Sequence, residues 1–346
     1  MILNKKQFWG TLIAIALLAY CVKDVRLSEL ETMLQRANYL YLIPATIFAF
    51  VFIVLKGLRW KLMLSQHRKI PVVRAVTLYS AGQILNVVMP MLTGQVGRMF
   101  LFAKKEGLRK TFVFSTIVLE ILFDAISLLI FLFLTSIAFA VPEGYRAISP
   151  ILMSVTLVLL VLLYLLLHFQ RQMENLGHKY FRPRWPSIYI GVKKFIRSFT
   201  KGIEMLRSSQ HLFGSLFYSL GSWAAHILVV YFLLRSLDLQ LPFAAAAAIV
   251  IINTLAVMVP ITPGNAGTFE VVVIGSLAAF GVGRSEAMLL ALALHLLDFV
   301  PIFAMGYAFL HQERISISEI RKVPRDSRVL NVLGEDGAYV EYEEGA

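Results

Sequence analysis

Long apolar runs separated by polar loops make up most of this chain. Six of the runs come close to the roughly 20 residues that a helix needs to cross the hydrocarbon core of a bilayer. They lie near residues 8–22, 40–58, 112–140, 149–169, 211–237 and 286–310. We therefore predict an all-α polytopic membrane protein with about six full spans.

Proline and glycine residues interrupt two further apolar segments. The stretch "NVVMPMLTGQVGR" contains the pattern Pro-x-x-x-Gly-x-x-Gly, and "VMVPITPGNAG" contains it again. The residues of the pattern are Pro90, Gly94 and Gly97 in the first copy and Pro260, Gly264 and Gly267 in the second. Proline ends a helix by removing a backbone donor, and glycine accepts the torsions of a tight reversal. We therefore predict that these residues form a turn in each copy.

Basic residues flank the first interrupted segment, near 75–97, on both sides, which places both of its ends in the cytoplasm. A segment that enters and leaves on one side is a re-entrant helical hairpin. Irregular backbone at membrane depth is tolerated only where protein or a water-filled cavity surrounds it. In this interpretation Arg98 lies at the cytoplasmic mouth of the hairpin. The alternative is an ordinary span that is kinked at Pro90.

The second copy of the pattern indicates an internal repeat. The intervening spans make the second hairpin enter from the outside, opposite to the first, so we predict inverted repeats over about 75–140 and 243–310. The total is then about eight membrane segments. Inverted repeats with broken helices are typical of transporters, and their binding sites lie where the breaks meet.

Composition supports the membrane assignment and gives an orientation. With 58% hydrophobic and 16% charged residues and a mean hydropathy of +0.73, the chain has too little polar surface for a soluble globule of 346 residues. Most of the 33 lysine and arginine residues lie before the first span, on either side of the first interrupted segment, in 170–210 and after the last span. These loops should be cytoplasmic. We expect a multi-pass protein of the plasma membrane with both termini in the cytoplasm.

The net charge of +12 bears on the partners of the protein. Because the charge is spread over short loops beside the membrane, it favours anionic lipid of the inner leaflet over nucleic acid. Cys21 is the only cysteine, which excludes an intramolecular disulfide.

Four acidic residues, Glu120, Asp124, Glu270 and Asp298, fall within apolar segments, where an unpaired charge costs roughly 3 kcal/mol or more. His295 and Asp298 form a further polar pair at helical spacing. One interpretation is that these groups line a transport pathway. The alternative is structural, with the acids protonated or paired with Arg59, Arg98 or His295. A metal site built from them is disfavoured because no Glu-x-x-His pattern repeats.

The candidate pathway or substrate-binding residues lie in or near the interrupted segments and the apolar spans. They are Arg59, Asn86, Pro90, Gly94, Gly97, Arg98, Glu120, Asp124, Asn253, Pro260, Pro263, Gly264, Gly267, Glu270, His295 and Asp298.

Over roughly residues 8–310 the chain resembles the membrane domain of lysylphosphatidylglycerol synthases, a flippase-like family of integral membrane proteins. The resemblance rests on "GLRWKLML", "NVVMPMLTGQVGR", "LEILFD" and "PITPGNAGTFE". The residues that match the family's motifs are Pro90, Gly94, Arg98, Glu120, Asp124, Pro260, Pro263, Gly264, Gly267 and Glu270. The resemblance implies a lipid flippase.

The chain departs from the family pattern at four places that change the charge of the expected cavity. Gln95 replaces a glutamate, Ile121 an arginine and Asn265 a glycine, and His295 lies about where an arginine is common. The family's substrate therefore does not carry over directly to this chain.

Three regions are expected. Residues 1–310 form a single transmembrane domain, and 170–210 form a basic cytoplasmic loop whose part 187–207 has the periodicity of an interfacial helix. Residues 311–346 form a cytoplasmic tail that is partly disordered. This tail is too short for a soluble aminoacyl-lipid synthase domain.

The favoured function is translocation of an anionic amphipathic lipid, such as a phospholipid or a polyprenyl-phosphate-linked glycan. The alternative is a membrane partner of a separate lipid-modifying enzyme or glycosyltransferase. An intramembrane enzyme is least favoured, because the chain lacks Gly-x-Ser-x-Gly and metal-ligand motifs. We predict no enzymatic activity, no cofactor and no metal ion. No ATP-binding motif is present, so directed transport would need an ion gradient or a downhill lipid gradient.

Overall fold

The computed structural model describes residues 5–23, 25–65, 67–89, 93–138, 148–169, 172, 175, 186–257 and 261–314. All regular secondary structure in these ranges is helical. The predicted all-α class is therefore confirmed for the described part of the chain.

Four of the described helices are long and apolar enough to cross a membrane. They are α3 (Leu42–Leu64), α6 (Lys110–Ala138), α11 (Ser209–Ser236) and α14 (Arg284–Gln312). Two more expected spans are present as α1 (Lys5–Val22) and α8 (Ile148–His168). The apolar part of α1, Trp9–Val22, is shorter than a full span. The total of six spans stays a prediction.

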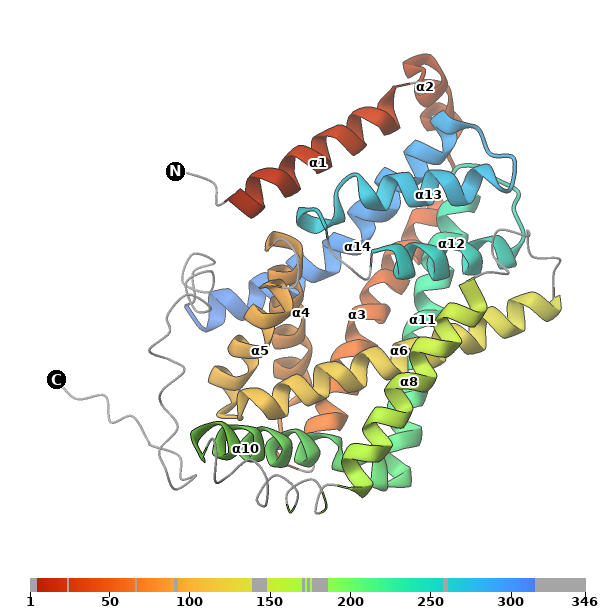
Figure 1. Cartoon of the computed structure of the whole chain (residues 1–346). Helices are drawn as coiled ribbons and strands as arrows, with labels where there is room; N and C mark the ends of the chain where they lie inside the picture. Colours follow the sequence, from red (N-terminus) through yellow and green to blue (C-terminus); the bar gives the residue numbers. More distant parts are fainter. Residues whose placement is uncertain are drawn as a thin grey trace.

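The first interrupted segment forms two helices, α4 (Val72–Val88) and α5 (Thr93–Glu106), which lie side by side (Figure 1). Their outer ends meet, because Nε of Arg74 donates to Glu106 across 2.7 Å. Glu313, just past α14, joins them by accepting from Arg74 at 2.6 Å and from Lys105 at 2.8 Å. The hydrogen bonds from Lys105 and Arg74 hold the pKa of Glu313 below its ordinary value. The two ends of this hairpin therefore lie on one side of the bundle.

The predicted role of the first pair of glycines is wrong. Gly94 and Gly97 lie inside α5 rather than in the turn, and Pro90 lies outside the described residues. Gly94 instead allows a close helix approach: a Cβ there would lie 2.6 Å from the Cα of Asn86. Proximity of the two backbones, and not a positive φ, is what requires glycine at this position.

The second interrupted segment forms α12 (Phe243–Ala256), the short 3-10 turn η4 (Pro263–Asn265) and α13 (Thr268–Ala278). Here the prediction is correct, because Gly264 and Gly267 have φ of 59° and 83°, a region that favours glycine. Pro260 lies outside the described residues. The two copies of the pattern therefore break their helices differently.

The tips of the two hairpins meet inside the bundle. A Cβ at Gly264 would lie 3.5 Å from the carbonyl oxygen of Val87, at the end of α4. α14 packs against α4 at Gly306, where a Cβ would lie 2.9 Å from the backbone nitrogen of Ala81. α3 and α11 run alongside each other through the centre (Figure 1). The breaks thus adjoin one another, as the repeat predicts, whereas entry into the membrane from opposite sides stays a prediction.

The remaining helices lie at the ends of the bundle. α2 (Leu27–Arg36) and η1 (Tyr39–Tyr41) precede α3, and α10 (Pro186–Ile203) and η3 (Glu204–Arg207) precede α11. In α10 the side chains of Phe199 and Ile203 are buried against the bundle, while Ile190, Val192 and Phe195 are exposed. The expected helix is present, and its position at a membrane surface stays a prediction. Most of 170–185 and all of 315–346, including the expected disordered tail, lie outside the described residues.

Candidate functional site

The first buried ion pair joins α5 to α6. Nη2 of Arg98 donates to both carboxylate oxygens of Glu120, each at 2.6 Å. The guanidinium carbon lies 4.7 Å from the ring centre of Tyr79 and 5.1 Å from that of Phe102. Arg98 is only 2% exposed. The prediction that Arg98 lies at the mouth of the hairpin is therefore wrong, because α5 continues past it to Glu106 and carries its side chain into the bundle.

The second ion pair lies one helical turn away on α6. Asp124 accepts from Nη1 of Arg59 at 2.6 Å and from Nζ of Lys56 at 2.8 Å, both on α3. The indole nitrogen of Trp223 on α11 donates to the same carboxylate at 3.0 Å, and Arg59 also bonds Ser219. Asp124 thus ties three helices together.

These five charged side chains form what we call the charge cluster: Lys56, Arg59, Arg98, Glu120 and Asp124. Three cations and two carboxylates give it a net charge of +1. The cations are almost fully buried, and the Asp124 side chain is the most open, at 22% exposure. Among the described residues, the buried Nε atoms of Arg59 and Arg98 have no acceptor. Each of them could donate one further hydrogen bond.

Sequence reasoning missed Lys56 and ended the second span near residue 58, before Arg59. The span is longer than predicted, because α3 extends to Leu64 and buries both side chains, leaving them 6% and 0% exposed. Their spacing of three residues puts them on one face of a helix. That spacing, opposite the acidic pair on α6, was the available signal.

The third pair joins α13 to α14. Nδ1 of His295 lies 2.6 Å from Oε1 of Glu270, and Oε2 of Glu270 accepts from the backbone nitrogen of Gly267 at 2.6 Å. Nε2 of His295 lies 2.9 Å from the carbonyl oxygen of Gly264. The imidazole packs 4.3 Å from the ring centre of Phe269. The pair therefore fastens the turn of the second hairpin to the last long helix.

The fourth pair was not expected, because His226 on α11 was not considered. Its Nε2 lies 3.0 Å from Oδ1 of Asp298 on α14. His295 and Asp298, which helical spacing places on one face of α14, bond different partners. We call His226–Asp298 and His295–Glu270 the histidine pairs. The signal for His226 was a single histidine inside an apolar span.

The charge cluster and the histidine pairs adjoin at two aromatic side chains. Nζ of Lys56 lies 4.3 Å from the ring centre of Trp223 and 5.1 Å from that of Phe52. The ring of His226 stacks on Phe52 at 4.7 Å and lies 5.9 Å from Trp223. Polar groups therefore continue from the first hairpin through α3, α6 and α11 to α14.

The other predicted site residues, Asn86, Asn253 and Pro263, lie on α4, α12 and η4. Asn86 on α4 donates to Gln83 at 2.8 Å, and its Oδ1 has no hydrogen-bond partner within the described ranges. Asn253 on α12 is buried, and its Oδ1 likewise has no partner in the part of the chain that the structure describes.

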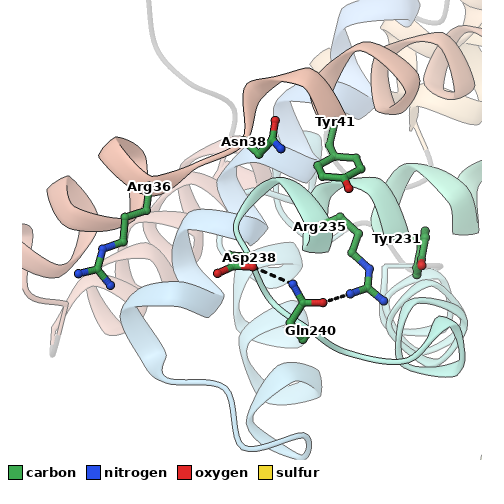
Figure 2. A pocket seen from close by; sticks show the side chains of 7 residues that line it. All are labelled: Arg36, Asn38, Tyr41, Tyr231, Arg235, Asp238 and Gln240. Atoms are coloured by element: carbon green, nitrogen blue, oxygen red, sulfur yellow. Dashed lines mark hydrogen bonds between the residues drawn. The ribbon is translucent and has the colours of Figure 1, made fainter.

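A separate polar pocket of about 470 Å³ lies where α11 ends and α3 begins (Figure 2). Arg235 donates to Gln240, which donates to Asp238 at 2.7 Å, while Arg36 points away from them. The pocket is lined by Arg36, Asn38, Tyr41, Tyr231, Arg235, Asp238 and Gln240. None of the predicted site residues lines it. Across the described part of the chain, no three histidine, cysteine or acidic side chains gather as metal ligands do.

The sequence of the chain is similar to that of known membrane proteins. The model of a family described as the lysylphosphatidylglycerol synthase transmembrane region matches residues 7–306. A UPF0104 membrane protein of Methanocaldococcus jannaschii is 23% identical over 314 residues, which are 86% of this chain and 90% of that protein. A UPF0104 membrane protein of Methanothermobacter thermautotrophicus is 21% identical over 323 residues, 89% of this chain and 95% of that protein. No solved structure matches the chain.

Proposed function

The chain belongs to the family of the lysylphosphatidylglycerol synthase transmembrane region, and from this membership we propose that it moves an anionic amphipathic lipid between the leaflets of a membrane. The observation that carries the proposal is the charge cluster, a buried group with a net charge of +1. The substrate class is a lipid with a phosphate in its headgroup, such as a phospholipid or a polyprenyl-phosphate-linked glycan.

The chemistry of the cluster suits a phosphate. Guanidinium groups hold phosphate oxygens with two parallel hydrogen bonds, and lysine adds a point charge. The two carboxylates hold the cations in place while no headgroup is bound. When a headgroup arrives, its oxygen atoms bond the cations on the side where Asp124 is most open, and the free Nε atoms of Arg59 and Arg98 supply further donors.

The arrangement of the helices supports a path for the headgroup. The tips of the two hairpins meet inside the bundle, and transporters of inverted-repeat design bind their substrates where broken helices meet. In our proposal the α4–α5 hairpin enters the membrane from the cytoplasm and the α12–α13 hairpin enters from outside. Both termini then lie in the cytoplasm, and the membrane is the plasma membrane. The proposal contains no catalytic step.

Purified protein reconstituted into vesicles tests the proposal. A fluorescent phosphatidylglycerol and a fluorescent phosphatidylcholine carry the same label, and a membrane-impermeant reductant destroys only the label that reaches the outer leaflet. We expect the protein to make inner-leaflet phosphatidylglycerol accessible faster than in protein-free vesicles, and faster than phosphatidylcholine. Loss of signal at the protein-free rate for both lipids would overturn translocation of this lipid class and favour the role of a non-transporting partner.

A further inference from the structure

The buried charges fall into two groups with different acid–base chemistry. In the charge cluster the carboxylates face Lys56, Arg59 and Arg98, and arginine keeps its charge at every physiological pH. In the histidine pairs the carboxylates face His226 and His295, and imidazole is the side chain that changes charge between pH 5 and 8. One group therefore has a fixed charge, and the other has a charge that depends on bound protons.

The charges of the two groups differ in sign when no proton is bound. The charge cluster carries +1, whereas two carboxylates and two neutral imidazoles give the histidine pairs −2. A headgroup with one negative charge that leaves the cluster for the histidine pairs would therefore meet like charge. Uncompensated charge in a buried site costs several kcal/mol. Each proton that binds an imidazole raises the local charge by one and removes part of this cost.

The positions of the two groups make such a transfer possible. The His226–Asp298 pair adjoins the charge cluster through Phe52 and Trp223, and His295 lies on α14 three residues before Asp298. Arg98 belongs to the first hairpin, and Glu270 belongs to the second. Two further titratable groups lie against the histidine pairs. Cys21 of α1 lies beside Glu270, and Lys56 of α3 contacts Phe52 and Trp223, the same rings that His226 contacts. Asp298 also lies near His295 on α14.

We propose that the histidine pairs bind a proton together with the anionic headgroup, so that the lipid and the proton cross the membrane in the same direction. This inference rests on the proposed function and adds its energy source. The proton passes from water on one side to an imidazole nitrogen of His226 or His295 and is released to water on the other side. No bond of the lipid changes. One proton for each singly charged headgroup makes the crossing electroneutral.

The test measures how a labelled phosphatidylglycerol is distributed between the leaflets of vesicles that hold a pH difference of about one unit. Because the coupling is thermodynamic, its direction does not depend on how the protein is oriented in the vesicle. With one proton per headgroup, we expect enrichment of up to about tenfold in the leaflet on the alkaline side. Labelled phosphatidylcholine and protein-free vesicles should show no enrichment.

Variants assign the effect to the histidine pairs. His295→Arg places a fixed charge beside Glu270 of the second hairpin, and combining it with His226→Gln should abolish the enrichment, because neither pair then holds an imidazole. His311→Arg makes the same change at an exposed position of the same helix and should keep the full enrichment.

Three results would count against the inference. Wild-type protein that exchanges phosphatidylglycerol but leaves it evenly distributed at every pH difference would overturn proton coupling and leave the proposed function standing. Enrichment that persists in a folded double variant would overturn the assignment to the histidine pairs. Absence of exchange at any pH would overturn the proposed function and the coupling together.

Discussion

At the scale of residues, each of the four acids within the apolar segments bonds a basic side chain, and these pairs define the candidate site. Sequence reasoning identified all four, since a carboxylate within an apolar span is costly and therefore rare. It named Arg59, Arg98 and His295 as possible partners, and each of them pairs with one of the acids, but it missed Lys56, His226 and Trp223. Lys56, His226 and Trp223 come from helices that are distant in sequence, and tertiary packing alone decides which of them faces Asp124 or Asp298.

The Arg98–Glu120 pair gives a direct test of whether each buried charge depends on its partner. Removing one partner of a buried ion pair leaves an uncompensated charge and typically costs about 3–5 kcal/mol, whereas removing both costs much less. We expect Arg98→Gln and Glu120→Gln each to lower the unfolding temperature in detergent by several degrees. The double variant should be more stable than either single variant.

Lys104→Gln is the matched control, because Lys104 lies on the same helix and is exposed. It should change the unfolding temperature little. A double variant that loses as much stability as the two single variants added together would contradict the pairing.

At the scale of elements, the sequence predicted the two broken segments but not how each one breaks. In the turn before α13, Gly264 and Gly267 have positive φ, as the pattern suggests. The two glycines of the first copy lie inside α5, and Gly94 is needed there because the backbone of α4 lies close to it. A one-dimensional pattern cannot distinguish a residue that turns the chain from one that lets two helices touch.

Gly94 and Gly97 separate these two roles experimentally. A Cβ at Gly94 would lie 2.8 Å from the carbonyl oxygen of Leu85, which is backbone and cannot rotate away. A Cβ at Gly97 would lie 3.3 Å from Sδ of Met89, the end of a flexible side chain.

Overpacking a tight contact costs typically 1–3 kcal/mol. We therefore expect Gly94→Ala to lower the unfolding temperature clearly and Gly97→Ala to leave it nearly unchanged, when both are measured by thermal unfolding in detergent. Equal effects at the two positions would contradict the close approach of α4 and α5 at Gly94.

At the scale of the whole molecule, hydrophobic patterning was sufficient for the all-helical class and for the long spans. The length of α3 was underestimated, because basic residues at its end were taken for a loop although their side chains are buried. The position of each hairpin relative to a membrane depends on the bilayer as well as on helix packing.

Cysteine labelling in intact cells tests that position. In a Cys21→Ala background, cysteines replacing Val73 and Lys104 lie at the exposed ends of the first hairpin. Cysteines replacing Gln240 and Ala279 lie at exposed positions beside the second. We expect a membrane-impermeant reagent outside the cell to label only the second set. Labelling of one residue from each set would contradict hairpins of opposite entry.

The central claim is that the positive charge of the buried cluster selects and carries an anionic headgroup. Lys56→Gln reduces the net charge of the cluster from +1 to zero, while Asp124 keeps its bonds to Arg59 and Trp223. Lys56→Arg keeps the charge.

The most direct test is the rate at which each reconstituted variant moves labelled phosphatidylglycerol, with Lys104→Gln as the control on an exposed lysine. We expect Lys56→Gln to slow this movement about tenfold or more, since a charge contact near 4 Å is worth up to about 4 kcal/mol in a partly shielded site. Lys56→Arg and Lys104→Gln should retain most of the rate. A folded Lys56→Gln variant that moves phosphatidylglycerol as fast as the wild type would contradict the account.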